Sequence, residues 1–345
     1  MRLSRCPAVG AALILLLVGG CAHTLPGTAN CTEPSHDPQK VELRYLGSGG
    51  IYLRWREDAI LLGPSFSNPN PIRARFLRVK PNEERIRKAL EGVELHRVRA
   101  IFAGHAHYDH IADIPTIARK INVPVHVNAM GTRVLAGEGL NVHELVIGKP
   151  VDVGTSFRVR AVKSGHAPQI CKWRRFPCVY AEGPEYDADW TTPITKRRLG
   201  AMRGGQTLAL VIELLDGDKE RFRIYYNDAS ADSPLGQTTG DFDLAILTIA
   251  QWQWAKDYPR DLLSVLRPRH VLVSHWDNFF KETSQQSRAV PFLTEESVKR
   301  FTHMIEDHVT TIDAGPVTPV CGDKREKWTM PAPASSMLFL PRGDS

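Results

Sequence analysis

The chain has 345 residues, of which 42% are hydrophobic and 24% are charged. These values are close to those of ordinary globular proteins, so a sizeable core is expected and a wholly disordered chain is excluded. The formal net charge is only +6, and no dense run of Lys and Arg with interleaved aromatic residues occurs, which argues against nucleic-acid binding.

The beginning of the chain has the features of an export signal. Arg2 and Arg5 supply a basic start, and an almost unbroken apolar run follows over residues 11–18. This run is too short to span a bilayer comfortably, which is typical of a secretory signal rather than of a membrane-spanning helix. An ordinary signal peptide followed by a chance cysteine is one interpretation.

The segment Val18-Gly19-Gly20-Cys21 favours a second interpretation, because it resembles the bacterial lipobox. The resemblance implies that residues 1–20 are a lipoprotein signal peptide and that Cys21 carries the lipid anchor. Residues 21–40, rich in Thr, Pro, Gly, Asn and Ser, are then a tether. Because residue 22 is Ala rather than Asp, the resemblance implies an exported protein on the outer membrane, facing the periplasm.

The remaining cysteines fit an oxidising compartment. They are Cys31, Cys171, Cys178 and Cys321, and four cysteines allow three pairings. We expect Cys171 to pair with Cys178 across a short segment and Cys31 to pair with Cys321, which would join the two ends of the domain. No Cys-x-x-Cys motif occurs, so a zinc ribbon is not indicated.

From Val41 onward, β-type runs alternate with helical patterns, which predicts one layered α/β domain over residues 41–345. The predicted strands are 41–46, 51–55, 59–62, 98–103, 123–127, 142–147, 157–162, 207–214, 222–226, 244–249, 270–273 and 336–340. The predicted helices are 82–90, 111–120, 130–136, 260–266 and about 295–308, the last capped by Thr294. The long irregular segment 167–205 is expected to be a functional loop or an insertion.

The strongest functional signal is the motif His105-Ala106-His107-Tyr108-Asp109-His110, directly after the predicted strand 98–103. Three imidazoles and a carboxylate this close together cannot all enter a core without partners. Neutral imidazole and ionised carboxylate are suitable ligands for zinc-like ions. The first two histidines can face one ion, while the aspartate and the last histidine serve a second one.

Three further residues of ligand type each follow a predicted strand: His166, Asp228 and His275. A single residue of this kind is more often structural than a ligand. Their recurrence at strand ends after the histidine motif favours a common edge of the sheets. The other histidines lack this context and are predicted to be structural or on the surface: His23, His36, His96, His126, His143, His270, His303 and His308.

The order His-x-His-x-Asp-His, His, Asp, His resembles the metallo-β-lactamase superfamily over nearly all of 41–345. The resemblance implies a four-layer αββα sandwich with two divalent ions at one sheet edge, zinc in the first place and manganese or iron as alternatives. It implies one ion held by His105, His107 and His166, a second held by Asp109, His110 and His275, and Asp228 as the bridge between them. Because β-lactamases of this fold typically lack a bridging carboxylate, Asp228 argues against that activity.

Finer features resemble one branch of the superfamily. Leu61–Ser67, Tyr108 and the His275-Trp276 pair followed by Phe279 resemble N-acylphosphatidylethanolamine phospholipase D and its bacterial relatives, and a neighbouring branch contains the ascorbate phosphate lactonases. The chain departs from this pattern at Gly63, where the family usually has an Asp that supports the metal ligands. The orientation of those ligands is therefore expected to differ here.

The resemblance implies a metal-dependent hydrolase that uses a metal-bridging hydroxide, with Asp109 as the catalytic residue that orients the hydroxide and moves its proton. A phosphodiesterase acting on a phospholipid-like or other anionic substrate is the first interpretation. A lactonase, or another cyclic ester or amide hydrolase, is the alternative. A non-catalytic envelope lipoprotein that binds a ligand is a third, but the presence of every ligand-type residue argues against it.

Two groups of residues bear on the substrate, a small molecule or a lipid. A basic stretch could attract a phosphate, although a solvated charged face is at least as common; it comprises Arg73, Arg75, Arg78 and Lys80. Aromatic residues of the long insertion could line an apolar pocket, lie at a membrane interface or simply pack the insertion; they are Trp173, Phe176, Tyr180, Tyr186 and Trp190.

Overall fold

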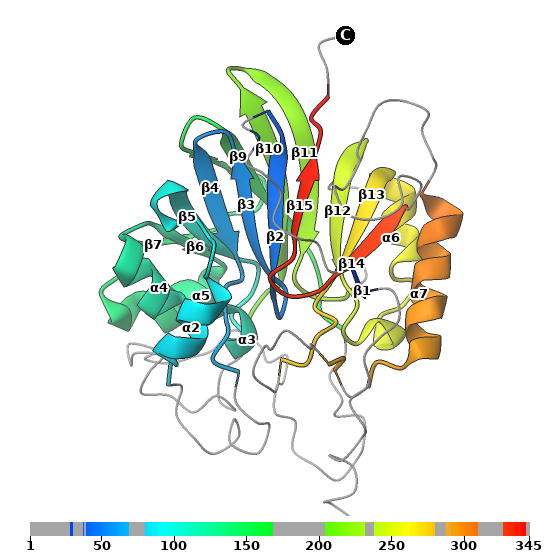
Figure 1. Ribbon diagram of the computed structural model, residues 1–345, viewed down its shortest axis with the longest axis horizontal. Helices are drawn as coiled ribbons and strands as arrows, with labels where there is room; N and C mark the ends of the chain where they lie inside the picture. The colour runs from blue at the N-terminus through cyan, green and yellow to red at the C-terminus, as the bar shows by residue number, and fades with distance from the viewer. Residues whose placement is uncertain are drawn as a thin grey trace, which may run out of the picture.

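A computed structural model describes residues 28–29, 37, 39–68, 80–167, 204–231, 238–279, 288–290, 292–309 and 327–342. Two β-sheets pack face to face, and helices cover the outer face of each sheet (Figure 1). The four-layer α/β sandwich that the sequence indicates is therefore confirmed. Among the described residues, no helix is both long enough and apolar enough to cross a membrane.

The first sheet has the strand order β15-β2-β3-β4-β5-β6-β7. Strands β15 to β4 pair in antiparallel fashion, and β4 to β7 pair in parallel. The strands are β2 Val41–Gly47, β3 Gly50–Trp55, β4 Asp58–Leu62, β5 Val98–Ala103, β6 Val125–Val127, β7 Val142–Glu144 and β15 Ser336–Phe339.

The second sheet has the order β1-β14-β13-β12-β11-β10-β9-β8. Strands β11 to β14 run parallel, so their carboxyl ends meet at one edge, while β8 to β11 are antiparallel neighbours. The strands are β1 Thr28–Ala29, β8 Pro150–Val153, β9 Phe157–Lys163, β10 Leu208–Asp216, β11 Lys219–Asn227, β12 Phe242–Thr248, β13 Pro268–Ser274 and β14 Trp328–Pro331.

Most helices lie on the outer faces of the two sheets (Figure 1). The α-helices are α2 Glu83–Ala89, α3 Tyr108–Ile111, α4 Ile114–Ile121, α5 Ala129–Leu135, α6 Arg260–Leu266 and α7 Glu295–His308, and the 3₁₀ turns are η1 Leu95–Arg97, η2 Ala136–Glu138 and η6 Trp252–Trp254. The predicted cap of the last helix is confirmed, because the Thr294 side chain accepts a hydrogen bond from the backbone N–H of Ser297.

The core has two parts, and strand β4 shows how they relate. Ile60 and Leu62 face the cluster between the two sheets, whereas Ala59 and Leu61 face the cluster between the first sheet and its helices. Alternate residues of a strand point to opposite faces, so β4 is buried on both sides, and its residues 59–62 are continuously apolar. Burial on both faces holds such strands in place, and with them the ligand-type residues that follow the strand ends.

The structure corrects two predicted elements. The predicted helix 111–120 corresponds to α4, which begins only at Ile114, and Ile111 instead ends the short helix α3; Pro115 in the first turn of α4 has no N–H to donate to the Ile111 carbonyl oxygen. The predicted strand 142–147 ends at Glu144, and the apolar residues Val146 and Ile147 that suggested its extension are exposed. Short strands β1, β8 and β14 were not predicted.

Several predictions fall outside the described residues. These are the export segment with Cys21, most of the tether, every disulfide cysteine, the aromatic residues of the insertion, His23, His36, Arg73, Arg75 and Arg78.

Candidate metal centre

Seven residues of ligand type gather where strands of both sheets end. The loop after β5 carries His105 and His107, and the short helix α3 carries Asp109 and His110. From the second sheet, His166 follows β9, Asp228 follows β11 and His275 follows β13. The seven form three overlapping groups in which the candidate ligand atoms lie within 4.8 Å of one another.

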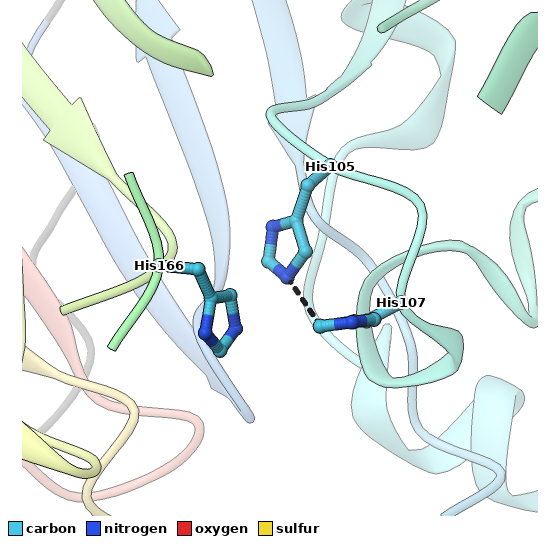
Figure 2. Close-up of side chains that lie close together, drawn as sticks. All are labelled: His105, His107 and His166. Carbon is cyan, nitrogen blue, oxygen red and sulfur yellow. Dashed lines mark hydrogen bonds between the residues drawn. The ribbon is translucent and has the colours of Figure 1, made fainter. Parts of the chain in front are cut away.

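The first group contains His105, His107 and His166 (Figure 2). His105 Nε2 lies 2.9 Å from His107 Nδ1, and the His166 ring lies 4.9 Å from the His107 ring. His166 Nδ1 donates to the carbonyl oxygen of Ala167 at 2.9 Å, so its lone pair is on Nε2. This group therefore offers only imidazole nitrogens.

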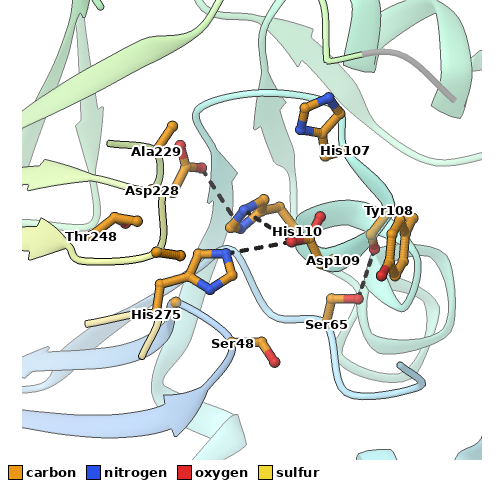
Figure 3. A network of polar contacts seen from close by, with 12 residues as sticks. Ser48, Ser65, His107, Tyr108, Asp109, His110, Asp228, Ala229, Thr248 and His275 are labelled. Atoms are coloured by element: carbon orange, nitrogen blue, oxygen red, sulfur yellow. Dashed lines mark hydrogen bonds and ion pairs between the residues drawn. The ribbon is translucent and has the colours of Figure 1, made fainter. Parts of the chain in front are cut away.

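The second group contains Asp109, His110 and His275, and all three are buried (Figure 3). Asp109 Oδ2 lies 3.4 Å from His275 Nε2 and 3.9 Å from His110 Nε2. This group therefore combines two imidazoles with a carboxylate.

Asp228 joins the two groups. It lies with His105 and His110 in the third group of ligand atoms. Its Oδ1 is 2.9 Å from His105 Nδ1, and its Oδ2 is 4.0 Å from His110 Nδ1. A proton on His105 Nδ1 makes the first contact a hydrogen bond to the carboxylate, which leaves the lone pair of His105 on Nε2, facing His107.

Asp228 can lie close to the histidines because residue 104 is glycine. The Gly104 N–H donates to Asp228 Oδ2 at 2.9 Å. A Cβ at this position would lie 2.3 Å from the carbonyl oxygen of Leu208 and 2.8 Å from Asp228 Oδ1. Both contacts are shorter than real Cβ atoms show, so any side chain here would push Asp228 away from the histidines.

Burial sets the protonation of the histidines. It lowers the pKa of His105 and of His107 well below the usual value, and it lowers the pKa of His110 to about 3. These imidazoles are therefore neutral at physiological pH, which is the form that binds a cation.

The two carboxylates differ from each other. Burial acts to raise the pKa of Asp109, but the imidazoles of His110 and His275 outweigh it and hold that pKa well below its usual range. Burial raises the pKa of Asp228, and the His110 imidazole and the Gly104 N–H oppose the rise only in part. A cation beside Asp228 would stabilise its ionised form.

The residues present fit divalent cations. The candidate ligand atoms of each group lie within 4.8 Å of one another, and burial keeps the imidazoles of His105, His107 and His110 neutral. Neutral imidazoles and carboxylates converging in a buried group are the donors that zinc, manganese and iron accept.

Gly63 lies beside His110 Nδ1, which is buried without a hydrogen-bond partner among the described residues. A Cβ at Gly63 would lie 3.2 Å from His110 Nδ1 and 3.0 Å from the Tyr226 hydroxyl oxygen. A side chain at position 63 would therefore reach His110 directly. With glycine there, His110 lacks the carboxylate support that the resemblance implies for this position.

The segment after Gly63 is fastened to the histidine motif. Ser65 Oγ donates to the carbonyl oxygen of Tyr108 at 2.9 Å (Figure 3). The buried Asp113 accepts the backbone N–H groups of Phe66 and Ser67. These bonds hold the loop beside α3 and the second group.

Sequence reasoning missed a buried pair that contacts His275. Tyr45 from β2 donates its hydroxyl hydrogen to Asp277, and burial together with the Asp277 charge raises the pKa of Tyr45 well above its usual value. The signal for Asp277 was present in the sequence, because a carboxylate two residues beyond a strand-end histidine resembles the other ligand-type positions. Tyr45 gave no such signal.

The remaining histidines that the structure describes lie outside the three groups. His126 stacks between Phe102 and His143, His270 contacts Thr329, and His96 and His303 are exposed. Of the basic stretch, only Lys80 is described, and it is exposed.

Comparisons with known proteins agree with this geometry. A family model described as a β-lactamase superfamily domain matches residues 59–304. A UPF0173 metal-dependent hydrolase from Cupriavidus necator strain H16 is 28% identical over 127 residues, which cover 36% of this chain and only 40% of that protein. The solved structure of Igni18, a metallo hydrolase from the archaeon Ignicoccus hospitalis, is similar in fold, with a TM-score of 0.52 and 15% identity over 87% of this chain and 98% of that chain.

Proposed function

The chain belongs to the β-lactamase superfamily, and on that premise we propose that it is a metal-dependent hydrolase whose substrate is an anionic ester, with a phosphodiester as the first candidate. The observation that carries the proposal is the convergence of seven ligand-type residues from both sheets in one buried group. A protein that used this fold only to bind a ligand would have no need of the complete set.

Each residue then has a role. One cation is held by His105, His107 and His166, a second by Asp109, His110 and His275, and Asp228 contributes to both. When bound, such cations lower the pKa of water and polarise the electrophilic oxygen of the substrate. Asp109 would orient the attacking water by accepting a hydrogen bond from it, because its carboxylate is ionised, buried and aimed into the group, and with bound cations acidifying that water it would pass on the proton.

The charge balance favours an anionic substrate. The ligand set contains neutral imidazoles and two carboxylates, Asp109 and Asp228, whereas two divalent cations bring four positive charges. An excess of about two positive charges, or about one once a hydroxide is bound, therefore remains in a buried site, where electrostatic attraction is strong. A phosphodiester would neutralise part of this excess, and a neutral lactone or β-lactam would not.

The position of the branch-specific residues supports a phospholipid-like substrate. Ser65 is bonded to Tyr108, and the Phe279 ring lies 4.9 Å from the His275 ring. The residues that resemble N-acylphosphatidylethanolamine phospholipase D therefore surround the second metal position rather than being scattered over the fold.

The proposal is tested on the purified chain after reconstitution with zinc, manganese or iron. Elemental analysis should give about two ions per chain. Turnover is then compared for bis(p-nitrophenyl) phosphate, a phospholipid, a γ-lactone, a thioester and a β-lactam. His126→Gln is the matched control, because it removes a buried histidine outside the group and should keep both ions. A chain without bound metal refutes the proposal, and faster cleavage of the lactone refutes the phosphodiester preference.

We also propose that the chain is an exported lipoprotein held by Cys21 at the outer membrane, facing the periplasm, with access to lipid substrates. Cys21→Ala should abolish membrane association, whereas Cys6→Ala, which removes a cysteine from the same export segment, should not. Equal membrane fractions for both variants would contradict the lipid anchor. Peptide mapping without reduction tests the proposed Cys171–Cys178 and Cys31–Cys321 disulfides in the same preparation.

A further inference from the structure

A buried pair of side chains connects the two sheets beside the second metal position. Tyr45 lies on β2 of the first sheet, and Asp277 follows β13 of the second sheet. The Tyr45 hydroxyl donates to Asp277 Oδ1, and the two residues are 0% and 3% exposed. The bond is therefore shielded from water, where hydrogen bonds to a carboxylate are strong.

The same tyrosine oxygen contacts the backbone of His275. The His275 N–H donates to it at 3.0 Å. His275 has a φ of +56°, in the left-handed region that residues other than glycine rarely adopt. Such a conformation persists only where its surroundings hold it, and the bond to Tyr45 is one such restraint.

Asp277 also fixes the turn that packs on the histidine rings. The Ser48 N–H lies 3.0 and 2.9 Å from the two Asp277 carboxylate oxygens. A Cβ on Gly49, the next residue, would lie 3.2 Å from His275 Cδ2 and 3.3 Å from His110 Cε1. The turn therefore lies so close to two imidazoles of the second group that a side chain on Gly49 would press against both rings.

We propose that Tyr45 and Asp277 are positioning residues for the second metal position, an inference that rests on the proposed metal-dependent function. Tyr45 holds the backbone of His275 in its left-handed conformation, and Asp277 holds both Tyr45 and the Ser48–Gly49 turn. Together they aim the His275 and His110 rings at the second ion. Among the hydrogen bonds found for the described residues, those of Tyr45 and Asp277 lead to His275 and to the Ser48–Gly49 turn, so we expect the larger effect on the second ion.

The test separates positioning from simple stabilisation. Tyr45→Phe removes a buried hydroxyl that contacts His275. Tyr258→Phe removes a comparably buried hydroxyl that donates to the Thr248 carbonyl oxygen at 2.7 Å and contacts no candidate ligand. Each purified full-length variant is melted without metal and titrated with zinc against a chelator. We expect both variants to have a lower melting temperature. Only Tyr45→Phe should lower the affinity for one of the two ions, by about tenfold or more.

Asp277 supplies the second arm of the test. Asp277→Asn keeps an oxygen that can accept from Tyr45 or Ser48, so it should retain more affinity for that ion than Asp277→Ala. Tyr45→Phe and Asp109→Asn should lower the affinity for the same ion. His107→Gln should lower the affinity for the other ion. Unchanged zinc affinities in Tyr45→Phe and Asp277→Ala, in a protein whose wild type binds two ions, would overturn this inference alone. A wild type without bound zinc would instead overturn the proposed function together with it.

Discussion

The two candidate metal positions are built differently. The first consists of His105, His107 and His166 and offers only imidazole nitrogens. The second contains Asp109, whose carboxylate stays ionised between two imidazoles, and its His275 backbone is held by Tyr45. The first position thus depends on the orientation of its rings, whereas the second also has a charge of its own.

Because of this difference, Asp228 is expected to matter for metal binding at both positions. It holds the His105 ring through Nδ1, and it lies near His110 of the second position. It is therefore the carboxylate nearest to the all-imidazole position and the one group that the two positions share. The contrast between the positions can be tested by removing one charge at a time.

The largest effect is expected for Asp228. Asp228→Ala should lower occupancy at both positions and reduce turnover by about a hundredfold or more, the scale for losing a preorganised electrostatic group. Asp228→Asn keeps an acceptor for the Gly104 N–H but loses the charge, so it should preserve folding better than metal binding. Metal content, turnover and thermal melts of both variants decide the matter. A fully metallated and fully active Asn variant would show that Asp228 only caps the turn after β11.

A smaller and more selective effect is expected for Asp109. Asp109→Asn should weaken binding of the second ion by roughly 10–100-fold and leave the first ion bound, because Asp109 belongs to the second group of ligand atoms and not to the first. His107→Gln should show the reverse selectivity. Zinc stoichiometry at graded chelator concentrations measures both. Equal weakening of the two ions in each variant would mean that the positions are not independent.

A third expected effect concerns folding rather than metal binding, and it is an acid sensitivity of the metal-free protein. Burial lowers the pKa of His110 to about 3, whereas histidine in an unfolded chain titrates near 6.5. Between these values the unfolded state binds the extra proton, so the free energy of unfolding decreases as the pH falls from about 6.5 towards about 3. His110→Asn should flatten this dependence by at most about 1.4 kcal/mol per pH unit.

Urea unfolding of the metal-free protein between about pH 7 and about pH 4 provides the measurement. Because burial also lowers the pKa of His105 and His107, the variant should keep part of the slope, contributed by the first position. A slope identical to that of the wild type would show that His110 is not buried in its neutral form in solution.

Much of the site could be predicted because each ligand-type residue follows an apolar run. The run before His105 and the run before His275 are the buried strands β5 and β13, and strand ends bring distant positions to one edge. Both signals, a continuous apolar run and a polar residue at the end of that run, can be recognised within a short stretch of sequence. The face-to-face packing of two sheets came from the family resemblance rather than from these patterns, and the order of the strands was not predicted.

The parts that escaped prediction depend on contacts between distant segments. Tyr45 and Asp277 are 232 positions apart, and only the packing of β2 against the end of β13 brings them together. Strand β8 is a short edge strand with mostly exposed or half-exposed residues, so it has no apolar pattern to detect. The split between α3 and α4 was readable in principle from Pro115, but the apolar spacing of the segment favoured one helix.

Gly104 gives the centre a vulnerability that no list of ligands would disclose. It has no side chain to bind an ion or a substrate, yet a methyl group at this position would collide with the Leu208 carbonyl oxygen and with Asp228. In a saturation-mutagenesis map, this position should therefore be as intolerant as the ligands themselves. A search for inactive natural variants should weigh a single Gly104→Ala replacement as heavily as the loss of a histidine.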